Sequence, residues 1–198
     1  MVQGDEYMED RSIKKLLTIN VILLVLFLMI AACDGGQDGG DSTPEPTTPP
    51  PTSSPPPGDF QTNMLDLINE ARAEARDCGD TFFPAAPPVN WDDRVEAAAL
   101  AHSIDMAETG FFDHEGSDGS NTGDRLMNEG YDPSDWGETI LVGLDKETKV
   151  IESFLKSPEH CEILMTPSFE DVGVGTAEGR FHGHSARYWT LDLATEKN

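Results

Sequence analysis

The stretch GFFDHEGSDGSNTGDRLMNEGYDPSDWGETI, residues 110–140, contains the polar residues around which we expect the fold to be arranged. It presents His114 after two aromatic residues, continues through a loop of small polar residues, and reaches Glu138 in a GET sequence before an apolar run. A histidine and a carboxylate that are each presented by a turn can converge on one ligand or one metal ion. They can equally be separate surface residues, or a buried pair that holds the loop in place.

The composition limits the kind of partner. The chain has 198 residues, with 13 Lys and Arg against 37 Asp and Glu, and a formal net charge of -24. A chain of this length accommodates one ordinary domain of about 100–150 residues plus appendages. Its negative surface repels phosphate backbones, so no nucleic-acid partner is expected. Solubility, or adaptation to a salty environment, accounts for the acidity without a specific ligand.

The N-terminal residues predict export. Basic residues precede the apolar run VILLVLFLMI (21–30), which is shorter than the roughly 20 residues of a comfortable membrane span. The run leads into IAAC (30–33), which resembles the lipobox of bacterial lipoproteins. We therefore expect a lipoprotein signal peptide over residues 1–32 and a lipid anchor on Cys33, which would hold the protein on a cell-envelope membrane, at its periplasmic or extracellular face. A signal anchor is the alternative.

Residues 33–59 are rich in Pro, Gly, Ser and Thr and nearly free of apolar side chains. Such a segment cannot bury enough surface to offset the entropy of ordering it. It is predicted to be a disordered tether between the lipidated cysteine and a folded domain that spans residues 60–198.

Within that domain, helical patterns precede strand patterns. Apolar residues spaced three or four apart are typical of amphipathic helices, and short apolar runs between turn residues are typical of strands. Helices are expected over 61–77, over 91–110 with Asn90 as N-cap, over 123–129, after Asp145, and as a turn over 160–165, and strands over 138–143, 171–179 and 187–194. This order indicates an α+β fold with helices on a small, mostly antiparallel sheet.

Four further positions carry expectations from the residues alone. His102 has apolar neighbours within the second helix, which favours a hydrogen-bonded core histidine over a ligand-binding one. Arg125 is expected to pair with a loop carboxylate and not with a ligand. With Cys33 assigned to lipid, Cys78 and Cys161 are an even pair in an exported domain, which favours a disulfide. Metal ligation by these two cysteines is the alternative.

Eight motifs in order resemble the bacterial branch of the CAP superfamily, also called the SCP domain, which includes the cysteine-rich secretory proteins. They are AHSIDMA (101–107), GFFDH (110–114), DGSNTGDR (118–125), GY (130–131), WGETI (136–140), SPEHCEILM (157–165), VGVG (172–175) and YWTLDLA (188–194). The resemblance covers about residues 62–194. It implies a three-layer α-β-α sandwich with a small central antiparallel sheet, a cleft beside that sheet, and a bridge between Cys78 and Cys161.

The resemblance also nominates residues for the cleft. His114 matches the first histidine of the family's cleft, and Glu138 matches the glutamate of its GEN motif, with Thr139 in place of the asparagine. The family's second glutamate falls near Ser157, and its second histidine falls near Tyr188, so the chain departs from the family's full set.

His160, in the SPEH turn, is expected to complete a ligand cleft together with His114, Glu138 and Tyr188. Several members of the family hold a divalent metal in this place. Zinc or another divalent ion would here have His114, Glu138 and His160 as its ligands, and a tetrahedral zinc site needs three or four.

Two functions are then compatible with the sequence. The first is a membrane-tethered binding module whose cleft accepts an unknown small molecule, a lipid, a peptide or a cell-envelope component. The second is a metal-assisted hydrolase, a peptidase or cell-wall hydrolase, in which Glu138 or His114 is the catalytic general base. No serine or cysteine nucleophile stands in a recognised context, which favours binding.

Overall fold

The computed structural model describes residues 59–198. The predicted signal peptide, the lipidation site Cys33 and all but the last residue of the predicted tether therefore lie outside the described residues. Within residues 59–198, no helix has the length and apolar character that a membrane crossing requires.

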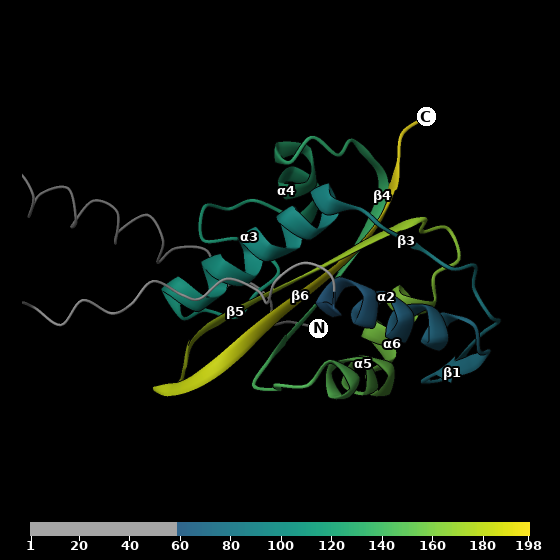
Figure 1. Ribbon diagram of the computed structural model, residues 1–198, viewed down its shortest axis with the longest axis horizontal. Helices are drawn as coiled ribbons and strands as arrows, with labels where there is room; N and C mark the ends of the chain where they lie inside the picture. The colour runs from purple at the N-terminus through teal and green to yellow at the C-terminus, as the bar shows by residue number, and fades with distance from the viewer. Residues whose placement is uncertain (1–58) are drawn as a thin grey trace, which may run out of the picture. The chain divides into compact units, whose positions relative to one another are not determined.

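A four-stranded sheet lies between two layers of helices (Figure 1). The strands are ordered β3 (Asn90–Trp91), β5 (Asp171–Phe181), β6 (His184–Glu196) and β4 (Pro133–Val142). Strand β3 runs parallel to β5, whereas the β5–β6 and β6–β4 pairs are antiparallel. The sheet is thus mostly antiparallel, as the sequence predicts.

The helices divide between the two faces. Helices α3 (Asp93–Thr109) and α4 (Thr122–Asn128) cover one face, and α2 (Asp59–Arg72), α5 (Glu147–Lys156) and α6 (Pro158–Met165) cover the other (Figure 1). A separate hairpin joins β1 (Arg76–Cys78) to β2 (Thr81–Phe83). The α+β class and the predicted three-layer α-β-α sandwich are confirmed.

The face beneath α2, α5 and α6 contains the main apolar core. Alternate residues of β6, Trp189, Leu191 and Leu193, point into it and are at most 1% exposed. Phe154 from α5 and Leu164 from α6 are fully buried against the same cluster. Burial of large apolar side chains contributes about 1.5–3 kcal/mol each, so this face is the main source of stability.

The face beneath α3 is built from small residues. An added Cβ on Gly173 would lie 2.0 Å from the backbone nitrogen of Glu96, and one on Gly175 would lie 2.2 Å from Cα of Leu100. The two glycines of VGVG therefore let the helix backbone lie directly on the strand. The hydroxyl of Ser103 donates to Gly175 O and Thr190 Oγ1 at 3.0 and 2.9 Å, so the contact is polar as well as close.

Five element boundaries or caps differ from the sequence predictions. The first helix ends at Arg72, not at residue 77, because residues 76–78 pair with 81–83 in a hairpin that turns at Gly79, with φ +62°. The predicted N-cap Asn90 lies in β3, and Asp92 caps α3 instead by accepting from the Arg94 N–H at 2.8 Å.

Asp145 is not the cap of α5. That helix starts after Lys146, which makes no side-chain capping bond. The predicted strand over 138–143 extends back to Pro133, because the register with β6 continues through Pro133 and Glu196. The last two strands are longer than the predicted 171–179 and 187–194, and a tight turn at His182 and Gly183 joins them.

Cys78 and Cys161 form a disulfide, with Cα atoms 5.4 Å apart and 83 residues apart in sequence. The bridge joins β1 to α6, and both cysteines are at most 1% exposed. The disulfide interpretation is confirmed, and metal ligation by these cysteines is wrong. In the chain-entropy treatment, closing so long a loop stabilises the folded state by about 4 kcal/mol.

Gly175→Ala is expected to destabilise the domain by about 3 kcal/mol, because the new methyl group would push α3 away from the sheet. Chemical denaturation of residues 59–198 measures this change. Glu178→Ala, an exposed change on the same strand, is the matched control and should alter the free energy of unfolding by no more than about 0.5 kcal/mol. Equal stabilities for the two variants would contradict the close contact.

Candidate functional site

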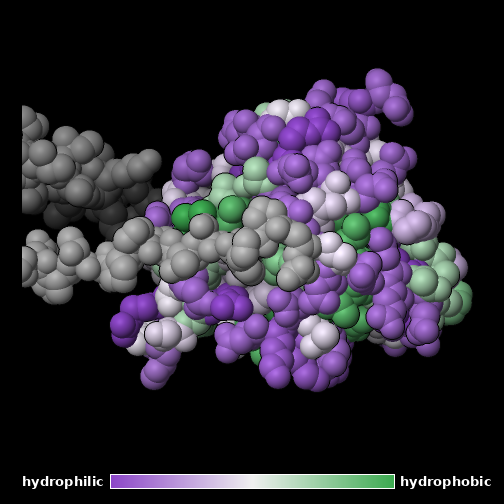
Figure 2. Space-filling view, viewed as in Figure 1, coloured by the Kyte–Doolittle hydropathy of each residue, from purple (hydrophilic) through white to green (hydrophobic). Residues whose placement is uncertain are grey.

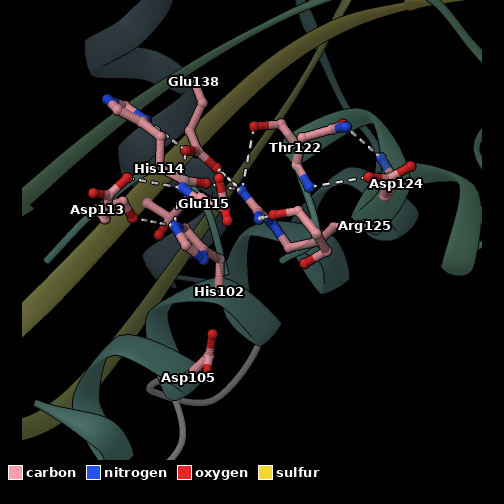
Figure 3. Close-up of polar contacts among 12 residues, drawn as sticks. His102, Asp105, Asp113, His114, Glu115, Thr122, Asp124, Arg125 and Glu138 are labelled. Carbon is pink, nitrogen blue, oxygen red and sulfur yellow. Dashed lines mark hydrogen bonds and ion pairs between the residues drawn. The ribbon is translucent and has the colours of Figure 1, made fainter. Parts of the chain in front are cut away.

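His114 and Glu138, 24 residues apart in sequence, meet in the structure (Figure 3). Helix α3 is capped at its C-terminus by Gly110, whose left-handed conformation (φ 75°) turns the chain into the loop that presents His114. Glu138 comes from the edge strand β4. Nδ1 of His114 lies 2.6 Å from Oε1 of Glu138, and the two side chains are 55% and 3% exposed.

Arg125 holds the second oxygen of the same carboxylate. Its Nη2 donates to Oε2 of Glu138 at 2.5 Å, and the guanidinium also donates to the backbone oxygens of Ser120 and His114 at 3.0 and 3.2 Å. Helix α4, which carries Arg125, begins with a capping box at Asn121. The expectation of a structural ion pair is confirmed, but the partner is on β4 and not in the loop.

His102 approaches the pair from beneath, on α3. It is 1% exposed, and its Nε2–H donates to the backbone oxygen of Asp113 at 2.9 Å. The same nitrogen lies 3.8 Å from Oε1 of Glu138. Burial lowers the pKa of His102, more than the nearby Glu138 charge raises it, so the ring is neutral at neutral pH. The prediction of a hydrogen-bonded core histidine is confirmed.

The charges of the group follow from these contacts. Burial opposes ionisation of Glu138, but the hydrogen bond from His114 and the charge of Arg125 outweigh it and hold the pKa of Glu138 below its ordinary value. The hydrogen bond to Glu138 in turn raises the pKa of His114, against a smaller opposing effect of burial. Glu138 is therefore an ionised, buried carboxylate between a permanent cation and a titratable one.

This arrangement fixes the chemistry that His114 can perform. Because Nδ1–H donates to Glu138, the neutral ring presents Nε2 as a free base, and the protonated ring presents an Nε2–H donor with a positive charge. A buried carboxylate that orients an accessible imidazole in this way is the arrangement of a general base, and equally that of a binding group for an anion.

His160 lies near the pair without joining it. It is partly buried on α6, with its ring edge-on to Phe154 at a centroid distance of 5.4 Å. Burial, and then the charge of His114, lower the pKa of His160.

The donor atoms do not fit the predicted zinc site. Within residues 59–198, no group of three or more His, Cys, Asp or Glu side chains is arranged to hold a metal ion. Both oxygens of Glu138 are already engaged, one by His114 and one by Arg125, so the pair offers only Nε2 of His114 as a free ligand. A zinc ion requires three or four.

Tyr188, the fourth residue of the predicted cleft, has no surface that a ligand can reach. Its side chain is fully buried in a cluster with Met106 and Ile140, and its hydroxyl donates to the backbone oxygen of Arg180 at 2.9 Å. The predicted place of Tyr188 in a ligand cleft is therefore wrong, because the ring belongs to the core.

The sequence did not reveal a polar hollow of about 210 Å³ between α3, the following loop and α4. His102 and Arg125 line it, together with the acidic side chains of Asp105, Asp118 and Glu129. Three acidic side chains against one arginine make the hollow unfavourable for anions.

A second carboxyl group beside the site was also missed. Asp192 on β6 is the direct cross-strand partner of Glu138 and is completely buried. Burial, and then the charge of Glu138, raise the pKa of Asp192 well above its ordinary value. The signal in the sequence was an acid placed between Leu191 and Leu193 in the predicted strand.

Residues 65–193 match the profile of the cysteine-rich secretory protein family, CAP. YkwD of Bacillus subtilis is 27% identical over 103 residues, which is 52% of this chain and 38% of that protein. The chain therefore spans little more than a third of that relative's length.

Two solved structures share the fold. An extracellular SCP-domain protein of Bacillus anthracis aligns with a TM-score of 0.56 at 21% identity, over 72% of this chain and 45% of its own. An outer surface protein of Borrelia burgdorferi aligns with a TM-score of 0.51 at 15% identity, over 70% of this chain and 90% of its own.

Glu138→Gln is expected to lower the pKa of His114 towards 6.5, its ordinary value, because it removes the charge that favours the protonated ring. An NMR titration of the imidazole measures this. The pKa of His114 in the folded protein lies above 6.5. The His114–Glu138 pair therefore stabilises the protein fully below pH 6.5, and its contribution falls as the pH rises through the raised pKa of His114. Glu178→Gln, exposed on β5, is the control, and an unchanged His114 pKa in Glu138→Gln would contradict the pairing.

Proposed function

The chain belongs to the cysteine-rich secretory protein (CAP) family, and we propose that it is a binding module of the cell envelope whose ligand is held by His114. The observation that carries the proposal is the contrast in exposure within one ion-paired group. The His114 side chain is 55% exposed, whereas Glu138 and Arg125 are 3% and 7% exposed. The buried pair orients the ring, and Nε2 is the atom available to a ligand.

The neighbouring surface supports a ligand with an apolar part. Phe112, two residues before His114, is 39% exposed and lies edge-on to Phe181 at 6.0 Å. Phe111, Val142 and Phe181 are themselves only partly buried around the cluster of Met106 and its neighbours. A lipid or a peptide with a carboxylate or phosphate beside an apolar portion matches this combination.

Because the protein as a whole is negatively charged, binding of an anionic ligand depends on the local positive charge of protonated His114. With a net charge of -24 and a mostly hydrophilic surface, as on the face in Figure 2, the molecule repels anions at long range. Protonated His114 offers an anionic group a short-range, charge-assisted hydrogen bond. Binding of such a ligand is therefore favoured below the raised pKa of His114 and weakens as the pH rises through it.

Hydrolysis is the second candidate, and one observation favours it. With Nδ1–H held by Glu138, the neutral ring leaves the Nε2 lone pair free to accept a proton from water. The reaction class would be peptide or peptidoglycan hydrolysis, with His114 as general base and Glu138 as the residue that orients it. No metal takes part in this scheme, because the donor set does not fit one.

Attachment to a membrane completes the proposal. The lipobox-like IAAC sequence and the Pro-rich residues 34–58 support lipidation at Cys33 and a tethered domain. The Borrelia burgdorferi protein is described as an outer surface protein and the Bacillus anthracis protein as extracellular, which agrees with display outside the cytoplasm.

His114→Ala is expected to weaken ligand binding by about tenfold to a hundredfold, since one charge-assisted hydrogen bond contributes roughly 1.5–3 kcal/mol. The probes are palmitate, a hexapeptide with a free C-terminal carboxylate, and isolated peptidoglycan, measured by calorimetry or co-sedimentation at pH 6. His184→Ala, an exposed change at the hairpin end, is the matched control and should bind as wild type does. Absence of saturable binding to all three probes by the folded protein would contradict the proposal.

The same variants separate binding from hydrolysis. Release of soluble fragments from peptidoglycan or peptide by wild type, abolished in both His114→Ala and Glu138→Gln with circular dichroism unchanged, would assign the site to a hydrolase. Saturable binding without fragment release would assign it to a binding module.

Cys33→Ala is expected to move the full-length protein from the membrane fraction to the soluble exported fraction of a bacterial host. Metabolic labelling with a palmitate analogue should label wild type and leave Cys33→Ala unlabelled. Thr43→Ala, in the predicted tether, is the control and should remain labelled. Unlabelled wild type that stays in the membrane would instead indicate a signal anchor.

A further inference from the structure

Asp192 lies at the centre of the sheet, directly beside the candidate site. In the register of the sheet it stands between Gly173 on β5 and Glu138 on β4. Directly paired residues of an antiparallel sheet have Cβ atoms about 4.5–5.5 Å apart on the same face. Asp192 is completely buried, and neither oxygen of its carboxyl group has a hydrogen-bond partner among residues 59–198.

The surroundings of Asp192 hold too little positive charge for two carboxylates. Arg125 on α4 is the permanent cation of the group, and its Nη2 already donates to Glu138. On α3 the buried His102 is neutral and supplies no positive charge, and on β5 the neighbour is Gly173, which has no side chain. His114, on its loop, is engaged by Glu138. A second buried anion would therefore be uncompensated, which is costly.

We propose that Asp192 is a positioning residue of the site, held as a neutral carboxylic acid that shares one proton with the Glu138 carboxylate. The pair then carries one negative charge, and the O–H of Asp192 fixes the carboxylate that orients His114. This role rests on the proposed function, because it concerns the charge that His114 offers to a ligand. The raised pKa of Asp192, caused first by burial and then by the charge of Glu138, agrees with the neutral form.

The neutral acid has a definite consequence for His114. An ionised Asp192 would add a second negative charge near the ring and keep His114 protonated to a higher pH. A neutral Asp192 instead donates to Glu138 and spreads its charge. Asp192 thereby limits how far the pKa of His114 rises, and so sets the pH at which the site loses its positive charge.

Infrared difference spectroscopy of Asp192→Asn against wild type at pH 7 tests the protonation state directly. The expected result is loss of the carbonyl band of a protonated carboxylic acid. Asp132→Asn, an exposed change, is the control and should lose only carboxylate bands. If Asp192→Asn loses only carboxylate bands as well, Asp192 is ionised and the proposal is overturned.

Two further readouts distinguish a positioning role from a merely structural one. The pKa of His114 should change by less than about 0.3 unit in Asp192→Asn, because one neutral donor replaces another. A fall of about one unit or more would show that a negative charge had been removed, and would overturn the proposal.

The second readout is the dependence of folding on pH. An acid whose folded pKa exceeds its unfolded value of 3.8 stabilises the fold least at high pH, because the folded state must keep a proton that the unfolded chain releases. The folding equilibrium constant of Asp192→Asn relative to wild type should therefore grow by up to about tenfold per pH unit above pH 4, until the folded pKa is reached. A ratio independent of pH would overturn the proposal.

If Asp192→Asn does not fold, the protonation state of Asp192 is measured by NMR on wild type with carbon-13-labelled aspartate. One carboxyl resonance that stays at the protonated position at pH 7 supports the proposal, and its absence overturns it. None of these measurements uses a ligand. Failure of the binding assays would leave the shared proton intact, and an ionised Asp192 would leave ligand binding by His114 intact.

Discussion

The buried negative charge of Glu138 is the constraint on which the α3 face of the protein depends. One of its oxygens accepts from the loop residue His114 and the other from Arg125 on α4, so a single carboxylate joins three segments that are separate in sequence. Breaking a buried ion pair on one side typically costs about 3–5 kcal/mol, because the remaining charge is left unpaired. The loop after α3 is therefore tied to the sheet and to α4 through the charge of Glu138, in addition to the apolar packing of Phe111.

The two faces of the sheet differ in the residues that pack on them. Beneath α2, α5 and α6, large apolar residues of β6 such as Trp189 and Leu191 build a continuous core. Beneath α3, Gly173 and Gly175 bring the helix backbone onto the sheet, and polar groups such as Ser103 and Thr190 bond across the contact. Because the first face supplies most of the apolar burial, the second can hold the polar groups that chemistry requires.

Periodicity in the sequence was sufficient for the class of fold. The alanine-rich pattern of α3, and the alternation along β6, identify elements that the structure contains. Motif resemblance was needed to bring His114 and Glu138 together, since nothing local links them. Neither periodicity nor motif resemblance predicts that Asp192 pairs with Glu138. A strand pattern gives the alternation of faces but not the register with its neighbour, and the register alone places these two acids side by side.

The net charge of the side chains around Glu138 then depends on the protonation of His114. Glu138 contributes one negative charge, Arg125 contributes one positive charge, and His102 is neutral because it is buried. With Asp192 neutral, as proposed, these fixed contributions cancel. Protonation of His114 therefore changes the group from neutral to cationic, on the one side chain of the group that is well exposed. On a protein with a net charge of -24, such a site attracts an anionic group only at contact distance and only when His114 is protonated. Selectivity at this surface thus arises from the geometry that Glu138 imposes on the ring and not from long-range attraction.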